Sequence, residues 1–354
     1  MSVAAAVGLD PAALLDRLLR HPSPTGSVDD AATMLVTLSA RAGFDSRRDA
    51  AGNVLMTWAG GPSPGDIVLL GHLDTVPGDL AIGEHDGRLH GRGSVDAKGP
   101  LAAALAAVSR LPTDRGRPVT VVAACDEEGP SLGARLLRNR PAPAHLIVLE
   151  PSGWDTVTTG YRGCVRLTVS LEHPSAHHAG PHPGAPDRLV AHLAALSAAI
   201  GGGGGRAVDR TTVRVNALTS ADDGRVDRAG ASLELRIPAG TGVDVVVERV
   251  SALLGDALLS VDSACEAVAV SRSNPTVRAL ARAIVGSGGS PRYTSKTGTS
   301  DLNVVLPAWG CSAAVYGPGD CSLDHSPNES IAIADLRRGT DVLEAALRAL
   351  RGPR

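Results

Sequence analysis

The sequence has no excess of positive charge and no long apolar run. Its 34 lysine and arginine residues face 37 aspartate and glutamate residues, which gives a net charge of −3. This balance argues against nucleic acid as a partner, because phosphate binding needs a basic surface. No apolar stretch approaches the roughly 18 residues of a membrane span, and the N-terminus lacks the basic start and apolar core of a signal peptide. We therefore expect a cytoplasmic protein that does not bind membranes.

Cysteine and lysine are also scarce. The five cysteines are widely separated and form no CxxC pair, so the sequence predicts neither a disulfide framework nor a thiolate zinc site. Only two of the 34 basic residues are lysines, Lys98 and Lys296, and both lie in glycine-containing motifs. A general preference for arginine over lysine along the chain accounts for the small number of lysines. Because arginine cannot replace a compact ammonium group, the positions of the two lysines favour roles in a site.

The chain, with 354 residues, is long enough for two domains. Its first part alternates short apolar runs with helical segments, which is typical of an α/β domain with a parallel sheet. The predicted buried strands cover residues 66–70, 118–124 and 145–149. The predicted helices cover 10–20, 28–42 and 100–110, with Pro100 opening the last, and then 275–286 and 331–351 near the C-terminus.

The middle of the chain has a different pattern. Alternating and helical segments follow one another in the order β-α-β-β-α-β, at residues 165–171, 186–200, 212–218, 232–237, 243–254 and 264–270. This is the order of a ferredoxin-like domain. We therefore predict a discontinuous α/β domain, residues 1–162 and 272–354, with an inserted ferredoxin-like α+β domain, residues 163–271.

Histidines and carboxylates follow the predicted strands at the point where each strand ends. His72 and Asp74 follow the first strand, Glu127 and Glu128 the second, and Glu150 the third. Open α/β sheets place their sites at the carboxyl ends of strands, so we expect these side chains to converge.

Two further motifs contribute Asp96, in a glycine-bounded loop, and His325 near the C-terminus. Each motif alone is typical of a polar surface loop, but their joint occurrence predicts a two-metal hydrolase. The two oxygens of Asp96 can bridge two metals, and Asp74 can fix the tautomer of His72. One member of the adjacent glutamate pair can bind metal while the other holds water.

In the order and content of these motifs, the chain resembles the acetylornithine deacetylase, succinyl-diaminopimelate desuccinylase and carboxypeptidase G superfamily of di-zinc amidohydrolases. The resemblance extends over nearly the whole chain. It implies one zinc ion held by His72, Asp96 and Glu150, and a second held by Asp96, Glu128 and His325, with cobalt as a substitute metal. It also implies a cis peptide bond after Asp96.

The resemblance assigns catalytic roles as well. It makes Glu127 the general base and Asp74 the orienting partner of His72. A histidine of the inserted domain would stabilise the oxyanion; it is matched to His177, with the adjacent His178 as the alternative because the surrounding motif departs from the family pattern. The inserted domain is expected to act as a lid and to form a homodimer.

A narrower resemblance rests on three segments, 160–163, 296–303 and 316–325. They are similar to a branch of hydrolases that release lysine or ornithine from the terminal glutamate of a small acidic amino-group carrier protein. The resemblance therefore implies this carrier as substrate and partner, with lysine, ornithine or a related diamino acid as product. An N-acyl-amino-acid deacylase or a dipeptidase is the alternative. A non-catalytic protein of the same fold is disfavoured, because no ligand or base has been lost.

The sequence also predicts substrate-binding residues. The expected contacts are Lys296, Asn216, Arg236, Tyr316, Gly298 and Ser300. Lys296 is favoured as the partner of the substrate carboxylate, because the neighbouring Gly298 permits close backbone approach.

Overall fold

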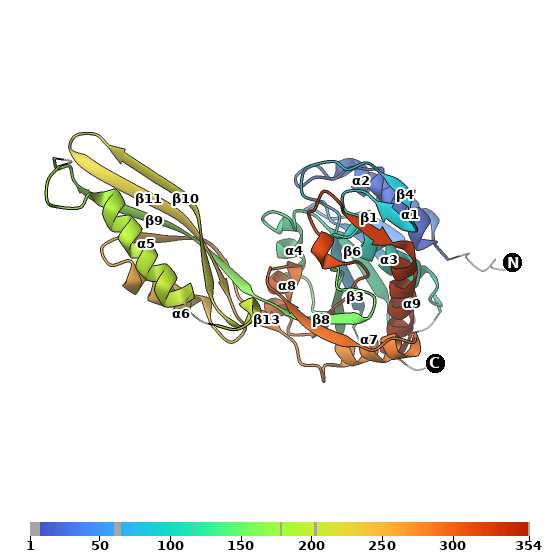
Figure 1. Cartoon of the computed structure of the whole chain (residues 1–354). Helices are drawn as coiled ribbons and strands as arrows, with labels where there is room; N and C mark the ends of the chain where they lie inside the picture. Colours follow the sequence, from blue (N-terminus) through green and yellow to red (C-terminus); the bar gives the residue numbers. More distant parts are fainter. Residues whose placement is uncertain (1–7, 60–64, 115, 178, 202–203, 353–354) are drawn as a thin grey trace. The chain divides into compact units, whose positions relative to one another are not determined.

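The computed structural model describes residues 8–59, 65–114, 116–177, 179–201 and 204–352. It divides into two compact units (Figure 1). Unit 1 contains the described residues up to Thr159, then Val270–Thr294 and the described residues from Val304 onward. Unit 2 contains Gly160–Ala269 and Ser295–Asn303.

The larger sheet has the strand order β1-β2-β6-β3-β7-β15-β8-β13, with β14 paired to β8. Its middle strands β6, β3, β7 and β15 are parallel to one another, and the predicted strands at 66–70, 118–124 and 145–149 are confirmed among them. The strands are Asp45–Arg48 (β1), Val54–Trp58 (β2), Ile67–His72 (β3), Val119–Ala124 (β6), His145–Val148 (β7), Thr156–Tyr161 (β8), Val268–Ala269 (β13), Arg292–Lys296 (β14) and Ser312–Val315 (β15).

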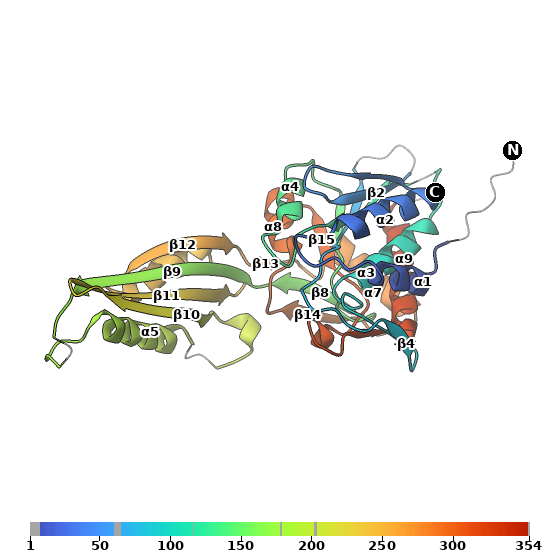
Figure 2. The same cartoon turned by 90° about the horizontal axis from the view of Figure 1, so that it is seen from above.

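Helices cover this sheet, as two perpendicular views show (Figure 2). They are Pro11–Leu19 (α1), Asp29–Arg41 (α2), Lys98–Ser109 (α3), Leu132–Leu137 (α4), Pro275–Gly286 (α7), Asp301–Trp309 (α8) and Ile333–Leu350 (α9). All twelve residues of α3 are buried, and the helix packs between α1 and α9. The predicted start of α3 at Pro100 is wrong by two residues. The missing N–H of Pro100 is tolerated at the third position, because the first four N–H groups of a helix have no helical partner.

A small sheet in unit 1 joins the C-terminal motif to the first half of the chain. Its strands are Gly83–His85 (β4), Arg88–His90 (β5) and Ser330–Ala332 (β16), in the order β16-β5-β4. The segment after His325 therefore runs beside the segment that leads to Asp96.

Unit 2 has the predicted β-α-β-β-α-β order. Its four strands form an antiparallel sheet in the order β10-β11-β9-β12, which is the ferredoxin-like arrangement. Its elements are Gly163–Pro174 (β9), Ala185–Gly201 (α5), the 3₁₀ helix Ala207–Asp209 (η1), Thr212–Asp222 (β10), Val226–Ile237 (β11), Val243–Leu253 (α6) and Leu258–Cys265 (β12). The fold class predicted from the sequence is confirmed.

The predicted last strand of this domain, residues 264–270, is wrong. The fourth strand is β12, and all of its residues are exposed or half-buried. It therefore lacks the alternation that identifies a half-buried strand in a sequence. The apolar residues just after it form β13, which pairs with β8 in the larger sheet.

Within the described ranges, no helix combines the length and the apolar character needed to cross a lipid bilayer.

Candidate metal centre

His72 is the last residue of the buried strand β3, and its side chain is only 1% exposed. Its Nδ1 lies 2.8 Å from the carbonyl oxygen of Asp74, so this nitrogen carries the proton and donates it. Its Nε2 lies 3.1 Å from Asp96 Oδ1 and 4.0 Å from Glu150 Oε1. The Asp74 carbonyl thus fixes the tautomer that leaves Nε2 as a metal ligand beside two carboxylates.

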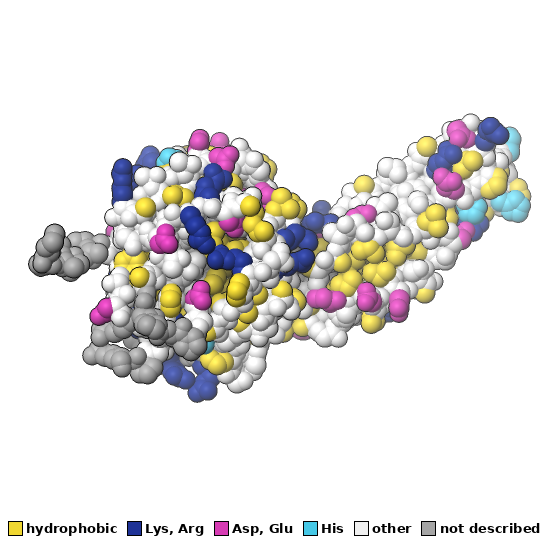
Figure 3. Space-filling model, turned by 180° about the vertical axis from the view of Figure 1, so that it is seen from behind, with side chains coloured by type: hydrophobic (Ala, Val, Ile, Leu, Met, Phe, Trp, Pro, Cys, Tyr) yellow, Lys and Arg dark blue, Asp and Glu magenta, His cyan; other side chains and the backbone are white. Residues whose placement is uncertain are grey.

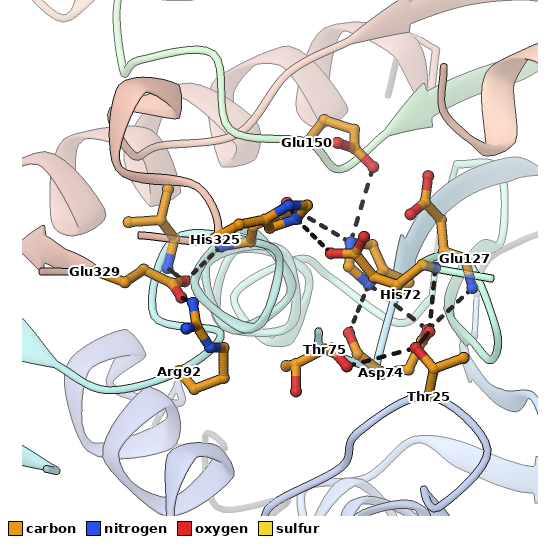
Figure 4. Close-up of polar contacts among 12 residues, drawn as sticks. Thr25, His72, Asp74, Thr75, Arg92, Glu127, Glu150, His325 and Glu329 are labelled. Atoms are coloured by element: carbon orange, nitrogen blue, oxygen red, sulfur yellow. Dashed lines mark hydrogen bonds and ion pairs between the residues drawn. The ribbon is translucent and has the colours of Figure 1, made fainter. Parts of the chain in front are cut away.

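Asp96 stands between the imidazoles of His72 and His325, which are labelled in Figure 4. Its Oδ1 faces His72, and its Oδ2 lies 3.1 Å from Nε2 of His325. His325 Nε2 also lies 2.7 Å from Glu128 Oε1. The Asp96 carboxylate therefore offers one oxygen to each of two groups of candidate ligands, one with His72 and Glu150 and the other with His325 and Glu128. This is the arrangement of a bridging ligand between two metals.

One three-residue cluster among the described residues joins members of both groups. Single ligand atoms of His72, Asp96 and Glu128 all lie within 4.8 Å of one another. This imidazole and carboxylate set is suited to a divalent metal such as zinc. These residues were all selected from the sequence, and the structure brings them together with Glu150 and His325.

The Asp74 carboxylate is fully buried but does not hydrogen-bond to His72, since its Oδ1 is 3.7 Å from His72 Nδ1. Its oxygens instead accept the backbone N–H groups of Glu127 and Glu128, at 3.1 and 3.2 Å, and the hydroxyl of Thr25 at 2.9 Å. Asp74 therefore fixes both the His72 ring, through its carbonyl, and the loop that carries the two glutamates. Thr25, which holds Asp74, was not identified from the sequence.

Backbone geometry at the centre is also unusual. Asp126 and His325 have positive φ values of 61° and 59°, a conformation that costs about 1 kcal/mol or more for residues other than glycine. The Asp96–Ala97 peptide bond is cis, as the resemblance implies. A Cβ at Gly99 would clash with the carbonyl oxygen of Ser94, so this glycine allows α3 to begin directly against the Asp96 loop.

The carboxylates raise the pKa of both histidines. At His325, hydrogen bonds to Asp96 and Glu128 raise the pKa to about 10. At His72, burial would lower the pKa, but the interactions with Asp74 and Asp96 and the charge of Glu127 outweigh it and raise the pKa well above its ordinary value. The carboxylates therefore make a strongly negative pocket that favours cations.

In unit 2, Lys296 lines a cavity of about 320 Å³ together with Tyr161, Arg162 and Ser295. Its ammonium group lies 5.9 Å from the centre of the Tyr161 ring. Arg162 holds the same segment, because its Nε donates to the carbonyl oxygen of Thr297 at 2.9 Å.

Arg236 also reaches the Lys296 segment, since its Nη1 donates to Thr299 Oγ1 at 3.3 Å. Burial and the charges of Arg236 and Arg210 lower the pKa of Arg162, which indicates a crowded cationic cluster. Apart from its two chain neighbours, no described residue would lie within 4 Å of a Cβ at Gly298, so packing does not require glycine there.

Two predicted substrate residues make structural contacts. Ser300 is 4% exposed, and it caps α8: its hydroxyl accepts the N–H of Leu302, and Asn303 Oδ1 accepts the N–H of Ser300. Tyr316 is fully buried, and its hydroxyl donates to the carbonyl oxygen of Trp154 at 2.7 Å. As placed, neither side chain is presented to solvent.

The other two predicted residues of unit 2 are exposed. Asn216 lies on strand β10, at an irregularity in its pairing with β11 between Val215 and Ala217. His177 lies after β9, and its Nδ1 accepts the N–H of Ala179 at 3.2 Å. The alternative residue, His178, lies outside the described residues.

Lys98, the other of the two lysines, makes hydrogen bonds within the protein. It is buried, and its Nζ donates to the carbonyl oxygens of Leu18 and His21 at 3.2 and 2.9 Å. Burial lowers its pKa to about 8. Lys98 therefore anchors the end of α1 to the start of α3.

Residues 68–349 match the model of Peptidase family M20/M25/M40. Among curated proteins, the chain is similar to a LysW-lysine hydrolase of Deinococcus radiodurans, with 39% identity over 96% of both chains. It is also similar to a LysW-lysine/LysW-ornithine hydrolase of Saccharolobus islandicus, with 29% identity over 81% of this chain and 82% of the relative.

Solved structures share the fold at low sequence identity. The aminopeptidase PepT of Bacillus cereus superposes with a TM-score of 0.81 at 18% identity, over 96% of this chain and 98% of that one. An M20 family metallo-carboxypeptidase of Sulfolobus solfataricus gives a TM-score of 0.77 at 17% identity, over 97% and 99%.

Proposed function

Because this chain belongs to peptidase family M20/M25/M40, we propose that it is a metal-dependent hydrolase that releases lysine or ornithine from an amino-group carrier protein. The observation that carries the hydrolase assignment is the position of Asp96, whose two oxygens face two different imidazoles. The carrier protein is proposed as substrate because the names of the relatives specify LysW-linked lysine or ornithine. An N-acyl-amino-acid deacylase or a dipeptidase remains the alternative, because solved structures of the same fold include a peptidase of short peptides.

Two zinc ions per chain are proposed as the cofactor, with cobalt as a substitute. His72, Asp96 and Glu150 would hold one ion, and Asp96, Glu128 and His325 the other. Bound there, the ions would polarise the scissile carbonyl and acidify water. The fit rests on the ligand type, since imidazole and carboxylate groups converge within contact distance of one another.

Glu127 is the proposed general base. Its backbone N–H donates to Asp74 Oδ1 at 3.1 Å, and its charge helps to raise the pKa of His72, so the carboxylate lies beside the ligand cluster. Its carboxylate would accept a proton from the attacking water and deliver it to the leaving amine. Asp74 would then serve catalysis by fixing the positions of both His72 and Glu127.

Unit 2 is proposed to act as a lid. From it, His177 would donate a hydrogen bond to the tetrahedral oxyanion. Lys296 would bind the carboxylate of the amino acid, and Arg236 and Asn216 are the alternative partners for that carboxylate. The cluster of Arg162, Arg236 and Lys296 supports an acidic substrate, because opposite charges favour encounter with a large charged partner.

Unit 2 is also proposed to form a homodimer. It carries six of the nine large hydrophobic side chains that are exposed among the described residues: Val190, Val215, Leu218, Val245, Leu258 and Val261. A group of hydrophobic side chains is visible on this unit in Figure 3. The long strand β10 lies at the edge of its sheet and is mostly exposed. Exposed apolar side chains and an open sheet edge both favour pairing with another chain.

Metal affinity should rise with pH. Without metal, His325 has a pKa of about 10 and is protonated at neutral pH. A metal can bind only the neutral imidazole, so binding must release this proton. We expect the apparent zinc affinity to rise about tenfold per pH unit for each proton released. Competition with a chromogenic chelator at pH 6, 7 and 8 measures it, and an affinity that does not change over this range would contradict the assignment of His325 as a ligand.

The test of the function is the mass of a loaded carrier protein. After incubation with this enzyme, the carrier should lose one lysine or ornithine residue. Faster cleavage of a small N-acetylated amino acid than of the carrier adduct would favour the alternative.

A further inference from the structure

We propose that Arg92 and Glu329 act as a positioning pair that holds three ligand-bearing segments of the metal centre in register. Within the described residues, the side-chain hydrogen bonds of Arg92 and Glu329 join them to each other and to backbone groups, and neither residue was assigned a role from the sequence. This inference rests on the proposed metal centre and adds to it the groups that fix its loops.

Glu329 is the first member of the pair. It follows His325 by four residues in a stretch that looks like an ordinary polar loop, yet its side chain is only 1% exposed. Its Oε1 accepts the backbone N–H groups of Val95 and Asp96 at 2.9 and 3.1 Å. One carboxylate oxygen therefore holds the backbone of the residue that offers oxygens to both ligand groups. Hydrogen bonds to a charged acceptor are the stronger kind.

Arg92 is the second member. Its Nη1 lies 2.8 Å from Glu329 Oε2 and also donates to the carbonyl oxygen of Ser326, the residue after His325, at 3.3 Å. Its Nε donates to the carbonyl oxygen of Gly78 at 3.0 Å, in the loop that follows His72 and Asp74. The guanidinium group therefore binds two further loops while it neutralises the buried carboxylate.

The pair thus connects three segments that are distant in sequence: the one after β3, the one before α3 and the one before β16. Figure 4 shows Arg92 and Glu329 beside His325 and the ligand cluster. The Arg92 side chain is 13% exposed, so both charges are largely removed from water and each depends on the other. Groups that orient metal ligands in this way typically change metal affinity by about 10- to 100-fold when they are altered.

The test uses two conservative variants, Arg92→Lys and Glu329→Gln. Lysine keeps the positive charge but cannot reach Glu329, Ser326 and Gly78 together. Glutamine keeps an acceptor for the two backbone N–H groups but loses the charge that Arg92 requires. Each variant should weaken zinc binding by about 10- to 100-fold. The absorption spectrum of the cobalt-loaded protein should also change, because it reports the geometry of the ligands.

Arg88→Lys is the matched control. Arg88 lies on β5 and donates to the hydroxyl and carbonyl oxygens of Ser330, at 3.0 and 2.7 Å. It thus holds the residue next to Glu329 without binding the segments that carry His72 or Asp96. We expect it to keep the wild-type zinc affinity and cobalt spectrum, even if the thermal unfolding temperature of the metal-free protein falls as much as in the other two variants.

Three results would overturn the proposal. The first is wild-type zinc affinity and cobalt spectrum in both Arg92→Lys and Glu329→Gln, with only a lower unfolding temperature. The second is an equal loss of affinity in Arg88→Lys. The third is a double variant whose loss is the product of the two single losses, because a pair that acts as one unit is not additive. Wild-type protein that binds no zinc would instead refute the proposed metal centre itself.

Discussion

Glu127→Gln should lower kcat by about 10²- to 10⁴-fold and leave the metal content unchanged. Glutamine has nearly the same shape as glutamate but cannot accept the proton of the attacking water. Its backbone N–H should still donate to Asp74, as in the wild-type protein, so the loop should keep its position. Steady-state kinetics and elemental analysis of the same preparation measure the two quantities.

Glu128→Gln is the matched control for Glu127, since it is the same change one residue along the chain. Glu128 Oε1 lies 2.7 Å from Nε2 of His325, within the ligand cluster. Its replacement should lower the metal content as well as the rate. Equal metal losses in the two variants would mean that the roles of Glu127 and Glu128 have been assigned wrongly.

Asp96→Ala should reduce the metal content below two ions per chain and lower kcat by at least about 10³-fold. The reason is that both ligand groups lose one oxygen at once, since Oδ1 faces His72 and Oδ2 faces His325. Metal polarisation of the reacting groups contributes several kcal/mol, and about 4 kcal/mol corresponds to 10³-fold.

Asp45→Ala is the corresponding control, because Asp45 is an exposed residue of β1 in the same unit. It should keep full metal content and full activity. A value of two ions per chain in Asp96→Ala, measured on protein loaded with excess zinc and then desalted, would contradict the bridging role of Asp96.

The metal ligands were predictable because they follow buried strands. β3, β6 and β7 are short apolar runs, and their parallel pairing brings His72, Glu128 and Glu150 to one edge of the sheet. Sequence position relative to a strand end is therefore enough to select His72, Glu150 and the Glu127–Glu128 pair, whereas the resemblance assigned the roles within the pair. His325 was selected from its motif instead, because a short 3₁₀ turn rather than a strand precedes it.

The supporting residues were not predictable in the same way. Glu329 stands in a polar stretch, and only the pairing of β16 with β5 shows that it is buried beside Val95. The carbonyl rather than the carboxylate of Asp74 contacts His72, a distinction that residue identity does not carry. Ser300 lies in a segment whose composition is typical of a ligand-binding loop, but its hydroxyl caps a helix.

The family relationship, the hydrolase class and the α/β fold with a ferredoxin-like insertion were all predicted from the sequence and are confirmed. The metal count, the role of His177 and the contacts of Lys296 stay predictions. They depend on the bound metal ions and the bound substrate, which the pattern of side chains does not determine.

Mass spectrometry of a carrier protein loaded with lysine or ornithine on its terminal glutamate tests the central claim most directly. The wild-type enzyme should remove one amino-acid residue from the carrier mass and release the free amino acid, and Glu127→Gln should do neither on the same time scale. N-acetylornithine and a dipeptide, supplied at equal concentration, should be cleaved more slowly than the carrier adduct. An unchanged carrier mass, with rapid cleavage of either small compound, would contradict the account.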